Sequence, residues 1–174
     1  FCSFEPYTIF KMKKFFVLFI AIISLQGCGP YSFTGVNTTA ESFQVNFFRN
    51  EAPIIEPGLD YDFTNALQDL ILNQTNLQLV NRNADLIYEG EIVEYRVSPM
   101  SATADQTAAQ NRLTISVNVR FYDTKNPEED FERRFSFFYD YPAATQLITV
   151  KQAAHDEIFE RITQDIFNET LANW

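Results

Sequence analysis

Cys28 is the residue whose neighbours point most directly to a chemical reaction. It follows an uncharged apolar run at residues 15–25, which is preceded by the basic sequence MKK at residues 12–14. A basic start, an apolar core of ~7–15 residues and small residues at its end are typical of a secretory signal peptide. The sequence LQGC at residues 25–28 matches a lipobox, in which the cysteine thiol carries a lipid as a thioether and the small preceding residue fits the signal peptidase. We therefore predict that Cys28 is lipidated.

Two alternatives remain for this segment. Cys28 could be a free or disulfide-bonded thiol, but a mature chain that begins there contains no second cysteine. The apolar run could be a transmembrane anchor, but a spanning helix needs ~20 apolar residues. Residues before Met12 are neither basic nor periodic, and we interpret them as translated upstream sequence. The predicted organisation is upstream sequence at 1–11, a signal peptide at 12–27, a lipidated tether at 28–41 and a folded domain at 42–174.

Few residues of the predicted domain could perform catalysis or hold a metal. His155 is the only histidine, and no second ligand stands at a spacing typical of a metal site, so we interpret it as a surface residue. Glu89 and Glu91 share one face of a predicted strand, as a general acid and base could, but any solvent-facing strand has the same spacing. Glycine-rich phosphate loops are absent from the sequence. The sequence therefore predicts no enzyme activity, no cofactor and no metal.

The acidic charge of the chain argues against two classes of partner. The sequence has 13 Lys and Arg against 23 Asp and Glu, and residues 1–27 hold three of these lysines and one glutamate, so the remainder has a net charge of about −12. A nucleic-acid binder needs a basic face to neutralise phosphates. An acidic surface is also unsuited to electrostatic attachment to anionic lipid. The predicted lipid on Cys28 must then supply the affinity for the membrane.

Apolar periodicity predicts the elements that build the domain. Alternating residues indicate half-buried strands, and apolar residues at a 3.6-residue period indicate helices with one buried face. The expected elements are a strand from Ser42 with Phe43, Val45 and Phe47 inward, a helix from Leu59 to about Thr75, a possible short strand from Leu77, strands at 85–99, 112–122 and 131–141, and a helix from Val150 towards Ala172.

Local irregularities add five more specific expectations. The alternation of strand 85–99 slips, which predicts a β-bulge or bend near Ile92 and Val93. Arg133 interrupts the apolar row of the last strand and should lie near the edge of the sheet. Thr149 and Gln152 match a capping box and predict the start of the last helix. Phe167 falls off the apolar stripe of that helix. Residues 98–111 are small and polar and are predicted to be a long loop.

These elements predict an α+β fold. Each helix has one apolar stripe, and the predicted sheet has one clean apolar face, which together fit a two-layer sandwich. We expect two amphipathic helices on one face of a mainly antiparallel four-stranded sheet, in the order β-α-β-β-β-α. Gln110, Asn111 and Arg112 join the predicted loop to its strand, where they could fix the loop through hydrogen bonds or bind a partner. Composition alone favours the first of these roles.

The mature chain resembles the LptE-like lipopolysaccharide-assembly lipoproteins of the Bacteroidota over residues 28–174. The stretches that carry the resemblance are CGPYSFTG from Cys28, QTNLQLVN from Gln74, ADLIYEGEI from Ala84, YRVSP from Tyr95, TAAQNRLTI from Thr107, and the terminal DIFN and ANW. TAAQNRLTI is the most specific of them. The resemblance implies a non-enzymatic outer-membrane lipoprotein that plugs, and helps to assemble, the β-barrel translocon LptD. It also implies a fold of two helices against a four-stranded sheet.

The same resemblance gives expectations for individual residues. Family members insert one end of the sandwich into the barrel, so the expected partner-binding loop includes Met100, Asp105, Gln106, Gln110, Asn111 and Arg112. Contact with lipopolysaccharide in other members uses basic side chains, for which the candidates here are Arg96, Arg112, Arg133 and Arg134. Because the chain is strongly acidic, we rank contact with the barrel above contact with lipopolysaccharide.

Residues after Cys28 also bear on localisation. Gly29 stands where an aspartate would signal retention in the inner membrane, and no acidic run follows of the kind that directs Bacteroidota lipoproteins to the cell exterior. We expect the inner leaflet of the outer membrane, facing the periplasm. The alternative function is a periplasm-facing lipoprotein module that binds a small ligand or a secreted polymer between helices and sheet, although the bulky side chains of residues 131–141 should fill such a gap.

Overall fold

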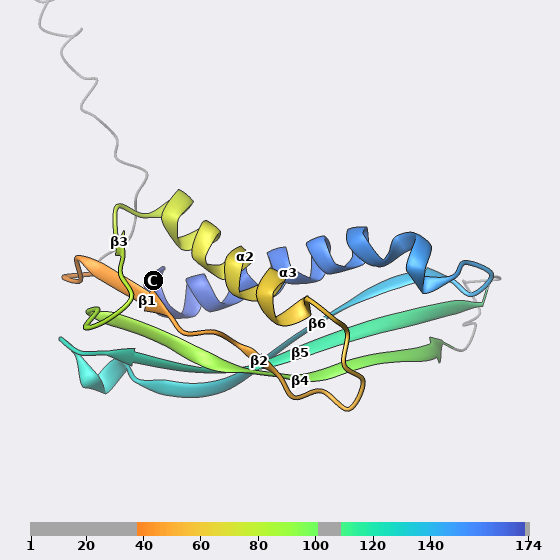
Figure 1. Cartoon of the computed structure of the whole chain (residues 1–174), viewed down its shortest axis with the longest axis horizontal. Helices are drawn as coiled ribbons and strands as arrows, with labels where there is room; N and C mark the ends of the chain where they lie inside the picture. Colours follow the sequence, from red (N-terminus) through yellow and green to blue (C-terminus); the bar gives the residue numbers. More distant parts are fainter. Residues whose placement is uncertain (1–37, 101–108, 173–174) are drawn as a thin grey trace, which may run out of the picture. The chain divides into compact units, whose positions relative to one another are not determined.

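The predicted two-layer α+β sandwich is confirmed (Figure 1). The structure is a computed structural model that describes residues 38–100 and 109–172. Helices α2 (Leu59–Gln74) and α3 (Leu147–Leu171) lie along one face of a single sheet. The predicted signal peptide, Cys28 with the tether up to residue 37, and Asp105 and Gln106 of the predicted loop lie outside the described residues.

The sheet has six strands in place of the four expected. They are β1 (Ser42–Val45), β2 (Arg49–Asn50), β3 (Gln78–Leu79), β4 (Leu86–Met100), β5 (Gln110–Asp123) and β6 (Phe131–Pro142). The spatial order is β3-β1-β4-β5-β6, and β2 pairs with β4 beyond the end of β1. The three long strands are antiparallel, whereas β1 is parallel to β3 and β4. The parallel pairing arises because α2 lies between β1 and β4 in the chain and returns it to the same edge of the sheet.

The first predicted strand breaks after Val45, which makes the expected inward position of Phe47 wrong. Phe47 is 54% exposed, whereas Phe48 is fully buried against Phe63, with ring centroids 5.1 Å apart. The reason is a change of partner along β4. Asn46 N–H donates to the carbonyl of Tyr88 at the end of β1, and pairing resumes only at β2 beside Glu91. The break between β1 and β2 shifts the alternation by one residue, so that Phe48 faces inward in place of Phe47.

β4 contains the predicted bulge. Its pairing with β5 shifts between Ile92 and Glu94, which leaves Val93 as the extra residue. Leu86, Tyr88 and Ile92 face the helices before the bulge, and Tyr95 takes that side after it. On β5 the predicted inward row is fully confirmed, since every member is buried: Leu113, Ile115, Val117, Val119 and Phe121. β6 lies at the edge of the sheet, as the position of Arg133 predicted.

The start of α3 differs from the prediction. The helix begins at Leu147, and its N-cap residue Gln146 makes no capping hydrogen bond with its side chain. Thr149 N–H already donates to the Gln146 carbonyl at 3.0 Å, so Thr149 lies inside the first turn and the capping box predicted with Gln152 is wrong. A turn after β6, closed by Thr145 N–H donating to the Pro142 carbonyl, leads the chain into the helix three residues before the expected Val150.

Two residues of α3 are buried against expectation: His155, interpreted from the sequence as a surface residue, and Phe167, which falls off the apolar stripe. His155 is 4% exposed and Phe167 is 5% exposed. α3 contacts both the sheet and α2, so it buries two adjacent columns of side chains where the sequence suggested one stripe. The buried residues are Ala154, His155, Ile158, Phe159, Ile162, Thr163, Ile166, Phe167 and Leu171.

Gly90 lets β4 approach its neighbours closely. A Cβ atom at this position would lie 2.0 Å from the Asn118 carbonyl oxygen and 2.7 Å from Cε1 of Phe48. We expect Gly90→Ala to lower the free energy of unfolding by about 1–3 kcal/mol, because the backbone of β5 must move to admit the methyl group. Urea denaturation measures this loss. Thr114→Ala on the same sheet is the control, and an equal loss in both variants would contradict the account.

Candidate functional site

The face of the sheet opposite the helices, called here the outer face, carries most of the candidate site residues. Side chains from β4, β5 and β6 form ion pairs and hydrogen bonds across this face, so that each strand is linked to its neighbours by side chains as well as backbone. The groups are centred on Arg120, Glu94 and Arg112 in order along the sheet. Because side chains of one strand alternate between faces, the polar residues of all three strands meet here.

Arg120 joins the two carboxylates that sequence analysis considered as an acid and base pair. Its Nε donates to Glu89 Oε1 at 3.2 Å and its Nη2 donates to Glu91 Oε2 at 3.0 Å. The hydrogen bond from Arg120 lowers the pKa of Glu91 below its ordinary value, and a hydrogen bond from Asn118 adds to the effect. A general acid needs a raised pKa. Arg120 and the two glutamates therefore form ion pairs that link β5 to β4.

Glu94 brings together two of the four candidate arginines. Arg96 Nε donates to its Oε1 at 2.8 Å, and Arg134 from β6 pairs with its Oε2. The hydroxyl of Ser116, on β5 between them, also donates to Oε2 at 2.8 Å and is within 2.9 Å of the Ser136 hydroxyl. The hydrogen bond from Arg96 is the largest cause of the lowered pKa of Glu94. The bulge makes this possible because it places Glu94 on the outer face.

Arg112 lies further along the outer face. Its Nε and Nη2 donate to the two carboxylate oxygens of Asp140, both at 2.7 Å, and its guanidinium lies 3.5 Å from the centroid of the Phe138 ring. Such bidentate pairing and stacking fix the side chain in one orientation. Arg133 is separate from the others, since it lies on the helix side of β6 and pairs with Glu169 of α3 at 2.6 Å. Each of the four arginines thus has a carboxylate partner.

Strand pairing extends into both ends of the predicted loop at 98–111. β4 continues to Met100 and β5 begins at Gln110, and these two residues are paired across the strands. Asn111 and Arg112 also lie in the strand, opposite Pro99 and Ser98. The expectation that residues 98–100 and 110–111 belong to the loop is wrong because backbone pairing does not require an apolar pattern. We call this end of the sandwich, with residues 96–100, 110–114 and 138–148, the distal end.

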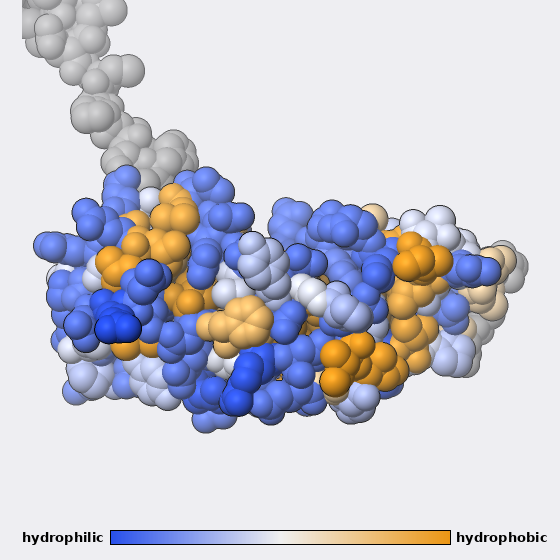
Figure 2. Space-filling model, viewed as in Figure 1, coloured by the Kyte–Doolittle hydropathy of each residue, from blue (hydrophilic) through white to orange (hydrophobic). Residues whose placement is uncertain are grey.

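Four exposed apolar side chains lie at the distal end, and sequence reasoning had named only Met100 among them. They are Val97, Met100, Phe138 and Ile148, of which Ile148 is 68% exposed. Ile54 and Ile55 are also exposed in the segment before α2, which an ion pair between Glu56 and Lys151 at 2.6 Å ties to α3. Figure 2 shows hydrophobic patches in the half of the molecule where α3 begins and also near the opposite end. Exposed apolar side chains that cluster at one end of a protein are typical of interaction sites.

Comparison with known proteins gives the family. Residues 40–170 match the family model for LptE, described as lipopolysaccharide-assembly. The chain belongs to this family. The match covers both helices and all six strands except the last residue of α3. Membership of the LptE family agrees with the resemblance stated on the sequence motifs. A search of curated protein sequences finds no match.

Solved structures confirm the fold at low sequence identity. A minor lipoprotein from Acinetobacter baumannii is 14% identical, with a TM-score of 0.51 over 76% of this chain and 94% of that one. The hypothetical protein CT253 from Chlamydia trachomatis is 12% identical, with a TM-score of 0.52 over 76% of this chain and 98% of that one. These likenesses concern the arrangement of helices and strands.

Two features are absent from the described residues. None of their helices is long and apolar enough to cross a membrane. Their His, Cys, Asp and Glu side chains form no group of three placed to hold a metal ion.

Glu94 gives a pH-dependent test of the outer face. Its lowered pKa means that its pairing stabilises the fold above the ordinary glutamate value and that this stability is lost as the pH falls through the folded-state value. We expect Glu94→Gln to be less stable than the parent at pH 7, and the difference to shrink below about pH 4.5. Urea denaturation at several pH values measures it. The exposed Glu132 is the control position, and a pH-independent difference for Glu94→Gln would contradict the account.

Proposed function

We propose that this LptE-family protein plugs, and assists the assembly of, an LptD-type β-barrel through which lipopolysaccharide reaches the cell surface. The observation that carries the proposal is the family match over residues 40–170. The role requires a rigid domain that presents a surface to a partner and requires no catalytic group. We therefore propose that the protein is a non-enzymatic lipoprotein.

We place the contact with the barrel at the distal end. The exposed Val97, Met100 and Ile148 support this placement, because apolar side chains that meet a partner lose their unfavourable exposure to water. The polar residues proposed to take part are Gln110, Asn111 and Arg112, together with Asp105 and Gln106 of the connecting segment. Arg112 is held by Asp140, which would present its remaining donors in a fixed direction.

The proposed lipid anchor would be attached at the other end of the sandwich. The described chain begins at Thr38, and the Thr39 carbonyl accepts a hydrogen bond from Lys125 Nζ at 2.9 Å, just beyond the end of β5. β5 has 14 residues, which span about 45 Å at ~3.4 Å per residue. A lipid on Cys28 would thus hold one end of the protein at the inner leaflet of the outer membrane and leave the distal end free for the barrel.

Direct contact with lipopolysaccharide is the weaker part of the proposal. Arg96, Arg112, Arg133 and Arg134 each have a carboxylate partner. A lipid phosphate would have to displace or share these carboxylates, within a chain of strong overall negative charge. Contact with a barrel wall requires no such exchange, and we rank it first.

Site-specific photo-crosslinking in the native membrane tests the placement. A photoreactive residue at Met100 or Ile148 should crosslink to a large β-barrel protein, because both side chains are exposed at the proposed interface. Tyr122, an exposed side chain near the opposite end of β5, is the matched control and should give little or no product. Crosslinks to a barrel from Tyr122 but not from Met100 or Ile148 would contradict the placement. No barrel product from any position would contradict the proposed function.

A further inference from the structure

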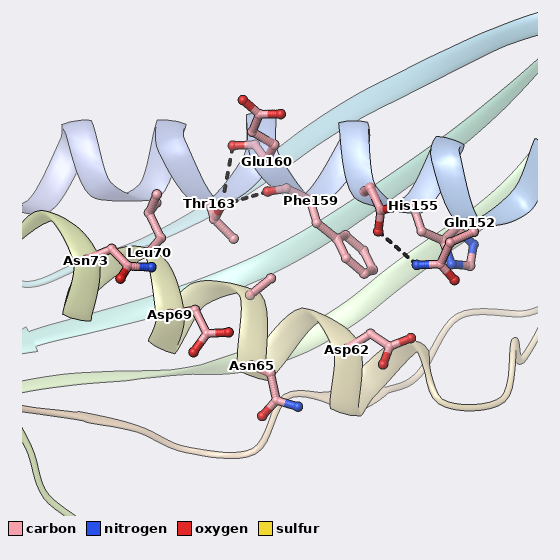
Figure 3. A pocket seen from close by; sticks show the side chains of 12 residues that line it. Asp62, Asn65, Asp69, Leu70, Asn73, Gln152, His155, Phe159, Glu160 and Thr163 are labelled. Carbon is pink, nitrogen blue, oxygen red and sulfur yellow. Dashed lines mark hydrogen bonds between the residues drawn. The ribbon is translucent and has the colours of Figure 1, made fainter.

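A groove of about 450 Å³ runs between α2 and α3 and has no part in the proposed contact with the barrel (Figure 3). Its inner surface includes Ala66 and Leu70 of α2 and Phe159 and Thr163 of α3. One end lies beside a hydrogen bond from Gln74 Nε2 to Gln164 Oε1 at 3.1 Å. The two helices are therefore joined at this end, and the groove opens between residues 62–73 of α2 and 152–163 of α3.

The charged residues of the groove are all acidic. Asp62 and Asp69 line it from α2, and Asp156 and Glu160 line it from α3. None of the four forms an ion pair with another described residue, and the described lining contains no lysine or arginine. The outer face is the opposite case, since Glu89, Glu91, Glu94 and Asp140 are each paired with an arginine there. The groove is thus the place where acidic side chains converge without cations.

His155 is a second and independent feature of the same groove. It lines the groove although it is 96% buried, and its Nε2 is 3.2 Å from the hydroxyl of Tyr95 in a hydrogen bond. Its Nδ1 has no hydrogen-bond partner among the described residues. No buried side-chain nitrogen or oxygen of the described residues lacks a hydrogen-bond partner, so Nδ1 retains some surface accessible to solvent. A largely buried imidazole thus forms part of the wall of the groove.

The protonation states of this pair are set by burial. Burial raises the pKa of Tyr95 to about 12, so the tyrosine stays protonated at neutral pH. Burial also lowers the pKa of His155, against the opposing effect of Glu56, Asp62 and Asp156, and Lys151 lowers it further. The imidazole is therefore neutral at pH 7 and adds no positive charge to the groove.

We propose that the groove between α2 and α3 binds a lysine- or arginine-bearing segment of a partner polypeptide. Four unpaired carboxylates supply the complementary charge, and the apolar inner surface can cover the hydrocarbon stems of lysine and arginine side chains. From Asp62 to Asn73 the groove follows 12 residues of α2, whose 11 steps of ~1.5 Å rise about 16 Å. That length suits several residues of a polypeptide better than a single small cation. The proposal does not depend on the proposed function.

His155 makes the proposal directly measurable. It is the only histidine of the chain, so its imidazole resonances report on this groove alone. The probe is a short peptide of alternating arginine and alanine, titrated into the protein purified from membranes with its N-terminal segment intact. We expect the resonances of His155 to shift on binding and its pKa to fall further, because a neighbouring cation disfavours the imidazolium form.

Matched variants separate the groove from the overall negative charge. Neutralising it with Asp62→Asn, Asp69→Asn, Asp156→Asn and Glu160→Gln should weaken peptide binding about tenfold, as expected for the loss of several exposed ion pairs. The control removes four exposed carboxylates elsewhere, with Glu128→Gln, Glu129→Gln, Glu132→Gln and Asp165→Asn, and should change the affinity less than about twofold. Asp69→Lys changes a single exposed side chain, and should weaken binding even if the fourfold variant fails to fold.

Three results would overturn the proposal. Equal weakening in the groove variant and its control would mean that only the general field of the protein attracts the peptide. Peptide binding without a shift of the His155 resonances would place the peptide elsewhere. Spermine that binds as tightly as the peptide and shifts the same resonances would identify a site for a small organic cation.

Discussion

The bulge at Val93 is the constraint on which both faces of the sandwich depend. One extra residue in β4 reverses the side to which every later side chain points. The bulge turns Glu94 to the outer face, where its carboxylate accepts hydrogen bonds from Arg96, Arg134 and Ser116. It also turns Tyr95 to the helix side, where the tyrosine hydroxyl forms a hydrogen bond with His155. Without the shift, a carboxylate would point at the apolar core, and the groove histidine would lose its partner.

Acidic residues lie in two different environments in the structure. On the outer face, carboxylates and arginines of adjacent strands neutralise one another, so that this face is polar but has little net charge at its centre. Between the helices, carboxylates are left unpaired beside a buried imidazole. The distal end differs from both, because it carries four exposed apolar side chains, those of Val97, Met100, Phe138 and Ile148. The molecule thus offers surfaces of three different kinds, and only the distal surface is used in the proposed contact with a barrel.

Local sequence patterns predicted the helices and long strands. The residues whose burial was not predicted are those that contact segments distant in sequence. The inward row of β5, the stripe of α2 and the bulge of β4 follow from alternation or periodicity within one segment. Phe48, His155 and Phe167 could not be assigned in this way, because each is buried by a neighbour distant in sequence. The same holds for the candidate site. Arg96 and Arg134 share the carboxylate of Glu94 only because the sheet places β4 and β6 on either side of β5. The groove likewise exists only where two helices converge.

The central claim is that this LptE-family chain works as one half of a complex with a β-barrel. Native mass spectrometry of the protein purified from its own membrane in mild detergent tests that claim most directly. The account predicts a species that contains one copy of this chain and one copy of a large β-barrel polypeptide. Recovery of the chain alone, or only in assemblies with itself, would contradict it.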